Sequence, residues 1–174
     1  MPALALVALS GVAVLAGCGG SSSATPASSP GGSCQGSTGD ASATTASYVV
    51  VLDVGGSETM YSPDQVSSQH PTTGEVMLGG AMTDVSGPNV RHVEAHICNR
   101  SGGAVVTDQQ PTITLQDTTA NTPSQDIPVA AMQGVTSGVS DYHYGNNAVL
   151  MPGHTYTVIV RLHGEAATLT YKAS

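Results

Sequence analysis

Histidine and methionine are the residues of this chain best suited to metal chemistry, and they are numerous for a protein of 174 residues. Imidazole binds copper, iron, nickel and zinc, whereas thioether sulfur prefers copper, above all Cu(I). The mixture favours copper or iron handling over a structural zinc site. Methionine also fills irregular cores, and because the chain has no Phe or Trp, a core role is preferred for Met77, Met82 and Met151. The candidates are His70, His92, His96, His143, His154 and His163, with Met60, Met77, Met82, Met132 and Met151.

The densest group is the segment His92-Val93-Glu94-Ala95-His96. Successive side chains of a strand point to opposite faces, so a strand over 90–98 places His92, Glu94 and His96 together on one face. Two imidazoles and a carboxylate within reach of one another are candidate metal ligands. The alternative interpretation is a polar strand face that simply contacts solvent.

Two other histidines lie near the ends of predicted elements. His143 belongs to the segment 141–147, which the turn residues Gly145, Asn146 and Asn147 predict to be a loop. His163 follows a predicted strand over 155–162 and points away from the apolar face of that strand. Taken alone, an isolated loop histidine is usually exposed.

The elements that must position these residues are strands. Runs rich in β-branched residues alternate with Gly, Pro, Asn and Asp, and no heptad or long helical period is present. Short strands at this spacing predict an all-β fold, an immunoglobulin-like antiparallel β-sandwich of seven to nine strands. The predicted strands are 48–54, 75–82, 90–98, 104–107, 112–116, 127–132, 148–151, 155–162 and 167–171.

The N-terminus predicts export and lipid anchoring. Residues 4–16 form an apolar run that is too short for a permanent transmembrane helix of about 20 residues. The run ends in Leu15-Ala16-Gly17-Cys18, which fits a bacterial lipobox with Cys18 as the lipidation site, although no basic residue precedes the run. We therefore expect a lipoprotein signal peptide at 1–18, a disordered Ser/Gly/Pro-rich tether at 19–46 and a folded domain at 47–174.

The net charge limits the classes of binding partner, and the cysteines allow one disulfide. The formal charge of −8 makes binding to a phosphate backbone unfavourable, so nucleic acid is excluded as an expected partner. The expected partners are the membrane, through the lipid, and cations. Cys34 and Cys98 remain after Cys18 is assigned to the lipid; they could pair in an oxidising compartment, but Cys34 lies in the predicted tether, so the pairing stays open.

In sequence order, the His-x-Glu of His92 and Glu94, the methionine Met132, the His-Tyr-Gly beginning at His143 and the strand ending at His163 resemble the periplasmic iron-transport proteins that accompany bacterial iron permeases. The resemblance spans roughly residues 90–171. It implies an immunoglobulin-like homodimer that binds copper or iron. It also implies that His92, Met132, His143 and His163 are ligands, with Glu94 a ligand or a neighbouring acid for a second metal state.

The chain departs from that family in three places. His96 stands where the family usually has Asp, the interval from Met132 to His143 is longer, and the His-rich C-terminal extension is missing. Metal binding is therefore a firmer expectation than coupling to an iron permease.

The sequence thus predicts a surface-tethered lipoprotein that captures or buffers copper or iron outside the cytoplasmic membrane, with delivery to a transporter as a further hypothesis. No G-x-S-x-G or other enzyme signature is present, so we expect a binding protein and not an enzyme. Two alternatives stay open. One is a copper-dependent oxidoreductase, because a His/Met site can cycle between oxidation states; the other is an interaction lipoprotein that binds no metal.

Overall fold

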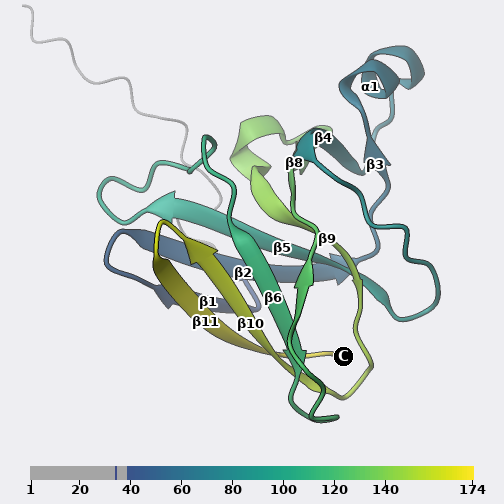
Figure 1. The fold of residues 1–174 in the computed structure, drawn as a ribbon. Coiled ribbons are helices and arrows are strands. Elements are labelled where there is room, and N and C mark those ends of the chain that lie inside the picture. The colour runs from purple at the N-terminus through teal and green to yellow at the C-terminus, as the bar shows by residue number, and fades with distance from the viewer. Residues whose placement is uncertain (1–33, 35–38) are drawn as a thin grey trace, which may run out of the picture.

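The computed structural model describes Cys34 and residues 39–174, which form two packed sheets (Figure 1). The first sheet has seven strands and the second has four, which confirms the predicted all-β sandwich. In spatial order the larger sheet contains β1 (Ala41–Thr44), β2 (Tyr48–Gly56), β5 (Val90–Asn99), β9 (His143–Val149), β8 (Ala130–Gly134), β4 (Glu75–Gly80) and β3 (Met60–Tyr61). The smaller contains β11 (Glu165–Lys172), β10 (Thr155–Leu162), β6 (Thr112–Asp117) and β7 (Gln125–Ile127). Their neighbouring strands are antiparallel except β3 and β4, which run parallel.

The core lies between the sheets and fixes the orientation of β5. Val93, Ala95 and Ile97 are buried in the core cluster, which also receives Val158 and Val160 from β10. Burying each large aliphatic side chain contributes roughly 1.5–3 kcal/mol. A one-residue slip of β5 would expose all of its apolar side chains, so the alternation holds the register. The polar face of β5 therefore points away from the smaller sheet.

Three element predictions were wrong. The segment around His143 is not a loop, because it begins strand β9, which pairs with both β5 and β8. Residues 104–107 form no strand and contribute one isolated bridge, between Val105 and Cys98. The single strand expected over 127–132 is divided between β7 and β8, which lie in different sheets. Pro128, which has no backbone N–H, lies at this crossing.

The folded domain begins earlier than residue 47. Strand β1 lies within the predicted tether and pairs with β2, from Ala41 opposite Leu52 to Thr44 opposite Val49. Cys34 is disulfide-bonded to Cys98 on β5, so the open pairing question is answered. The predicted signal peptide and the lipidation site Cys18 lie outside the described residues.

One helix was not predicted. Helix α1 (Pro63–Gln69) begins with a capping box, in which Ser62 and Gln65 each accept a hydrogen bond from the other's backbone N–H. It lies beside β3 and β4, beyond the body of the sandwich (Figure 1). A short 3-10 helix, η1 (Gly138–Asp141), leads into β9. Within residues 39–174, no helix has the length and apolar character needed to cross a bilayer.

Candidate metal centre

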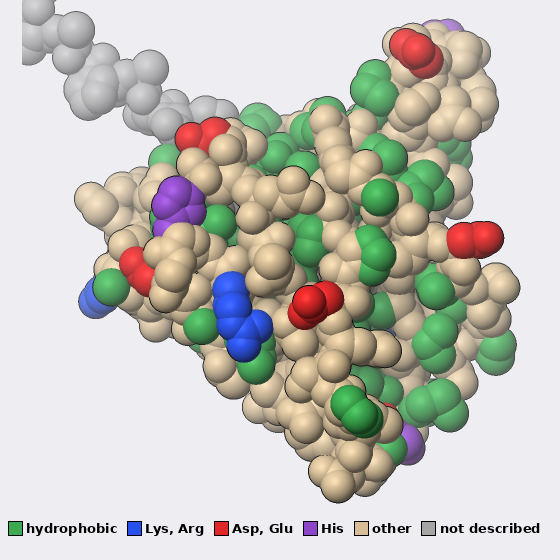
Figure 2. Space-filling view, in the orientation of Figure 1, with side chains coloured by type: hydrophobic (Ala, Val, Ile, Leu, Met, Phe, Trp, Pro, Cys, Tyr) green, Lys and Arg blue, Asp and Glu red, His purple; other side chains and the backbone are tan. Residues whose placement is uncertain are grey.

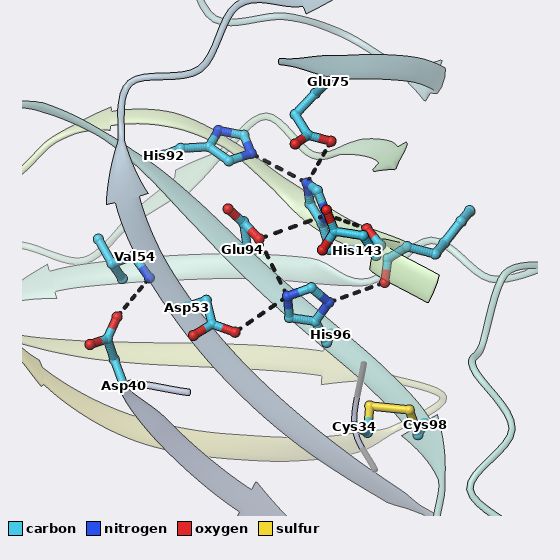
Figure 3. A network of polar contacts seen from close by, with 12 residues as sticks. Cys34, Asp40, Asp53, Val54, Glu75, His92, Glu94, His96, Cys98 and His143 are labelled. Atoms are coloured by element: carbon cyan, nitrogen blue, oxygen red, sulfur yellow. Dashed lines mark hydrogen bonds and ion pairs between the residues drawn. A yellow bond between two sulfur atoms is a disulfide. The ribbon is translucent and has the colours of Figure 1, made fainter. Parts of the chain in front are cut away.

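The candidate site lies on the outer face of the larger sheet, where four strands and the 3-10 helix η1 bring polar side chains together (Figure 3). β5 supplies His92, Glu94 and His96, as the sequence alternation predicts. β9 supplies His143, because its pairing with β5 places Tyr144 opposite Ala95 and so sets His143 beside His96. The remaining carboxylates are those of Asp53 on β2, Glu75 on β4 and Asp141 at the end of η1.

Four of these side chains form a group that could hold a metal ion. Glu94, His96, Asp141 and His143 each offer one ligand atom, and the four atoms lie within 4.8 Å of one another. His96 Nε2 is 3.3 Å from Glu94 Oε2 and 3.4 Å from Asp53 Oδ2. Two imidazoles with two carboxylates form a nitrogen and oxygen donor set that divalent transition metals accept.

Glycines make room for this group. Gly145 lies opposite Glu94, and a Cβ there would stand 1.9 Å from the Val93 carbonyl oxygen, so no side chain fits where β9 meets β5. A Cβ at Gly134 would lie 2.6 Å from Asp141 Oδ2. The Asp141 carboxylate thus occupies space that a side chain at residue 134 would fill.

Each of the three histidines of the site is oriented by a hydrogen bond from its Nδ1 atom. His143 Nδ1 contacts the Asp141 carbonyl oxygen at 2.8 Å, and His96 Nδ1 contacts the Tyr142 carbonyl oxygen at 3.2 Å. A carbonyl oxygen only accepts, so both Nδ1 atoms carry hydrogen. His92 Nδ1 donates to Asn147 Oδ1 at 3.1 Å. In the neutral rings Nε2 then holds the lone pair, and a fixed tautomer of this kind is how proteins orient metal-binding imidazoles.

The Asn147 amide is itself held in place. Its Oδ1 accepts from the Glu58 N–H at 3.3 Å, and its Nδ2 donates to the Glu58 carbonyl oxygen at 3.1 Å. These two bonds fix which end of the amide faces His92. Asn147 therefore acts on the site by setting the tautomer of His92.

Burial and neighbouring charge divide the ionisable groups into two sets. Burial lowers the pKa of His143 to about 4 and also lowers that of His92, so both are neutral near pH 7. Burial also acts to lower the pKa of His96, but its hydrogen bond to Glu94 and that carboxylate's charge outweigh burial and raise it. Burial acts to raise the pKa of Glu94, but the His96 hydrogen bond and the nearby histidines lower it. The contact between His96 and Glu94 thus shifts the pKa of each group toward its charged form.

Glu75 is the least satisfied side chain of the site. Its Oε2 is buried without a hydrogen-bond partner among the described residues, and only 7% of the residue surface is exposed. Burial, followed by the charges of Asp141 and Glu94, raises the pKa of Glu75 to about 8. Its Oε2 lies 3.9 Å from His143 Nε2.

The structure brings together most of the predicted ligands. His92 Nε2 lies 3.3 Å from His143 Nε2 (Figure 3), and His96, Glu94 and His143 belong to the four-residue group. Met132 lies directly opposite His143 on β8, so the two side chains share a face. Met132 is fully buried and packs in a cluster with Met60 and Ala130, against which Met77 rests.

His163 is placed elsewhere within this single chain. It lies in the turn after β10, in the smaller sheet, and its Nε2 is 2.5 Å from Gln109 Oε1. The core separates that sheet from the outer face of β5. The residues that sequence reasoning missed are Glu75, Asp141, Asp53 and Asn147, whose neighbours are set by strand pairing over long sequence distances.

Comparison with known proteins returned no relative: no family model, curated protein or solved structure matches the chain. The resemblance to periplasmic iron-transport proteins therefore stays a prediction. The basic side chains on the face shown in Figure 2 are few and separate, and no basic patch appears there.

Proposed function

We propose that this chain is an exported, lipid-anchored metal-binding protein that captures or buffers copper or iron outside the cytoplasmic membrane. The observation that carries the proposal is the convergence of Glu94, His96, Asp141 and His143 within 4.8 Å. Solvated polar strand faces do not bury their histidines, yet His96 is 3% exposed and His143 is 0% exposed.

The choice of copper or iron rests on donor chemistry. Imidazole with carboxylate suits Fe(II), Cu(II) and Zn(II), and the thioether of Met132 on the same face adds a preference for copper. His96 Nε2 lies between the carboxylates of Glu94 and Asp53. A metal ion that binds this nitrogen would replace the proton on it, which supports an exchange of a proton for a metal. Delivery to a transporter fits a carrier anchored beside a permease.

The same geometry favours a carrier over the two alternatives. An interaction lipoprotein has no need for buried, pre-oriented imidazoles. A copper oxidoreductase would share the donors but would turn over a cuprous or ferrous substrate. Anchoring through Cys18 places the domain at the outer surface of the cytoplasmic membrane or elsewhere in the cell envelope, where extracellular metal arrives.

Equilibrium dialysis of the purified full chain against Cu(II), Fe(II) and Zn(II) tests the proposal. We expect stoichiometric binding, and His96→Ala should weaken it by well over tenfold because it removes a ligand and the partner of Glu94. The matched control is His70→Asn: His70 caps α1 with a left-handed backbone that asparagine tolerates, and it lies outside the metal group.

Three results would contradict the proposal. Absence of stoichiometric binding by the unaltered chain would leave the interaction lipoprotein as the better reading. Equal losses in His96→Ala and His70→Asn would show that binding does not use this site. Multiple turnovers of Cu(I) or Fe(II) oxidation would assign the protein to the oxidoreductases.

A further inference from the structure

Two imidazole nitrogens in the site face each other without a hydrogen between them. His92 Nε2 and His143 Nε2 are 3.3 Å apart, and both rings already use their Nδ1 hydrogen on another acceptor. With both rings neutral, two lone pairs meet in a fully buried place, where no solvent relieves the repulsion. Such a pair is stabilised when a cation lies between the two nitrogens.

Glu75 supplies a carboxyl group that would become the negative ligand when a bound cation displaces its proton. Its Oε2 is buried, lacks a hydrogen-bond partner among the described residues and lies 3.9 Å from His143 Nε2. A buried carboxylate oxygen without a partner costs free energy, and a bound cation would remove that cost. Figure 3 shows Glu75 and His92 both directed toward the Nε2 edge of His143.

We infer that Glu75, His92 and His143 hold a second divalent transition-metal ion, separate from the ion expected at Glu94, His96 and Asp141. The inference rests on the proposed function and extends it. Two nitrogens bound to one tetrahedral ion at about 2.0–2.1 Å lie roughly 3.3 Å apart, the separation between His92 Nε2 and His143 Nε2. The carboxylate needs only a small approach to complete a two-histidine, one-carboxylate set.

The two positions differ in donors and in access. The Glu94 position is rich in carboxylate, and the Asp53 side chain beside it is 38% exposed. The Glu75 position has two nitrogens and one oxygen, and both of its histidines are fully buried. The Nδ1 edge of His143 faces Glu94 at 3.8 Å, so this ring lies between the two positions. An ion that enters at the carboxylate position therefore lies next to the buried imidazole position.

The test is the zinc stoichiometry of the full chain, measured by equilibrium dialysis with elemental analysis. Zinc is the probe because it accepts nitrogen and oxygen donors and does not change oxidation state. We expect two ions per unaltered chain and one ion in Glu75→Gln, a substitution that keeps the side-chain shape. His96→Ala should also retain one ion, at the Glu75 position.

Glu58→Gln is the matched control. Glu58 contributes negative charge near Glu75 and His92 but lies outside the proposed ligand set, so its loss should leave two ions bound. A second variant, His92→Gln, should reproduce the loss of one ion seen in Glu75→Gln. Thermal melting of each variant confirms that it is folded.

The outcomes separate this inference from the proposed function. One ion bound by the unaltered chain, lost in His96→Ala and kept in Glu75→Gln, would overturn the second position alone. Equal losses in Glu58→Gln and Glu75→Gln would show that charge and not ligation is responsible, and would also overturn it. No zinc, copper or iron bound by the unaltered chain would overturn both proposals.

Discussion

The pH dependence of stability in the metal-free protein depends most directly on Glu75. Its pKa in the folded state, about 8, lies above the ordinary value of 4.5 that we expect in the unfolded chain. The protonated carboxyl therefore contributes stability that is fully present below pH 4.5 and is lost as the pH rises through 8. Glu75→Gln mimics the protonated form at every pH, so the variant should lack this loss.

The size of the effect follows from the two pKa values. At about 1.36 kcal/mol for each pKa unit, their difference sets an upper limit of roughly 5 kcal/mol. Relaxation of the surroundings and water access reduce this to about 2–3 kcal/mol, since buried groups behave as though the effective dielectric were near 20. For a domain of this size, that corresponds to a change in Tm of roughly 10 °C.

Thermal melting in a chelator at pH 6.5 and pH 9 measures this directly. Over that range His143, with its pKa lowered to about 4, stays neutral and adds no change of its own. Its own contribution is present above pH 6.5 and is lost as the pH falls through 4. Only the part of the Glu75 contribution that remains above pH 6.5 is lost over that range, at most about 2 kcal/mol of the roughly 5 kcal/mol limit. The unaltered chain should therefore lose more stability between pH 6.5 and 9 than Glu75→Gln loses. Identical pH profiles would refute the reasoning.

Four further predictions concern packing, pairing and anchoring. Met132→Ala should lower the free energy of unfolding in urea by about 2–5 kcal/mol, whereas Met132→Leu should lower it by less than about 1.5 kcal/mol. If the Met132 sulfur binds metal, Met132→Leu should also weaken Cu(I) binding in dialysis. Gly145→Ala should force β5 and β9 apart, lowering both Tm and zinc affinity; an unchanged Tm would contradict the close approach. Reduction of the bond to Cys98 should cost about 4 kcal/mol in chemical denaturation, because it closes a loop between residues 64 apart. Cys18→Ala should abolish metabolic labelling with radioactive palmitate, and unchanged labelling would reject Cys18 as the anchor.

The sequence predicted the β5 face of the site because alternation is a local property. Val93 and Ala95 had to enter the core, so His92, Glu94 and His96 had to point outward together. Nothing local indicated that this outer face would be buried.

The region around His143 was misread because turn residues there serve pairing instead. Gly145 permits the close approach of β9 to β5. Asn146 is fully buried, and its amide donates to the carbonyl oxygens of Ala81 and Pro128, so a polar residue is satisfied inside a sheet. Such partners become visible only when the strands are paired.

Glu75 and Asp141 could not be found from spacing. Glu75 reaches the site because β4 pairs with β8 and β8 pairs with β9, two steps of register that sequence patterns do not encode. Asp141 arrives through η1, whose carboxylate lies over Gly134. Ser62 and Gln65, by contrast, carried a local signal for α1 in their capping-box spacing.

Anomalous diffraction from crystals soaked in Cu(II) or Fe(II) would show whether the outer face of β5 and β9 binds a transition metal. We expect an anomalous peak at the metal's absorption edge about 2.0–2.5 Å from donor atoms of Glu94, His96 and Asp141. No peak at this cluster in fully soaked crystals, or peaks confined to other histidines such as His154 or His163, would contradict it.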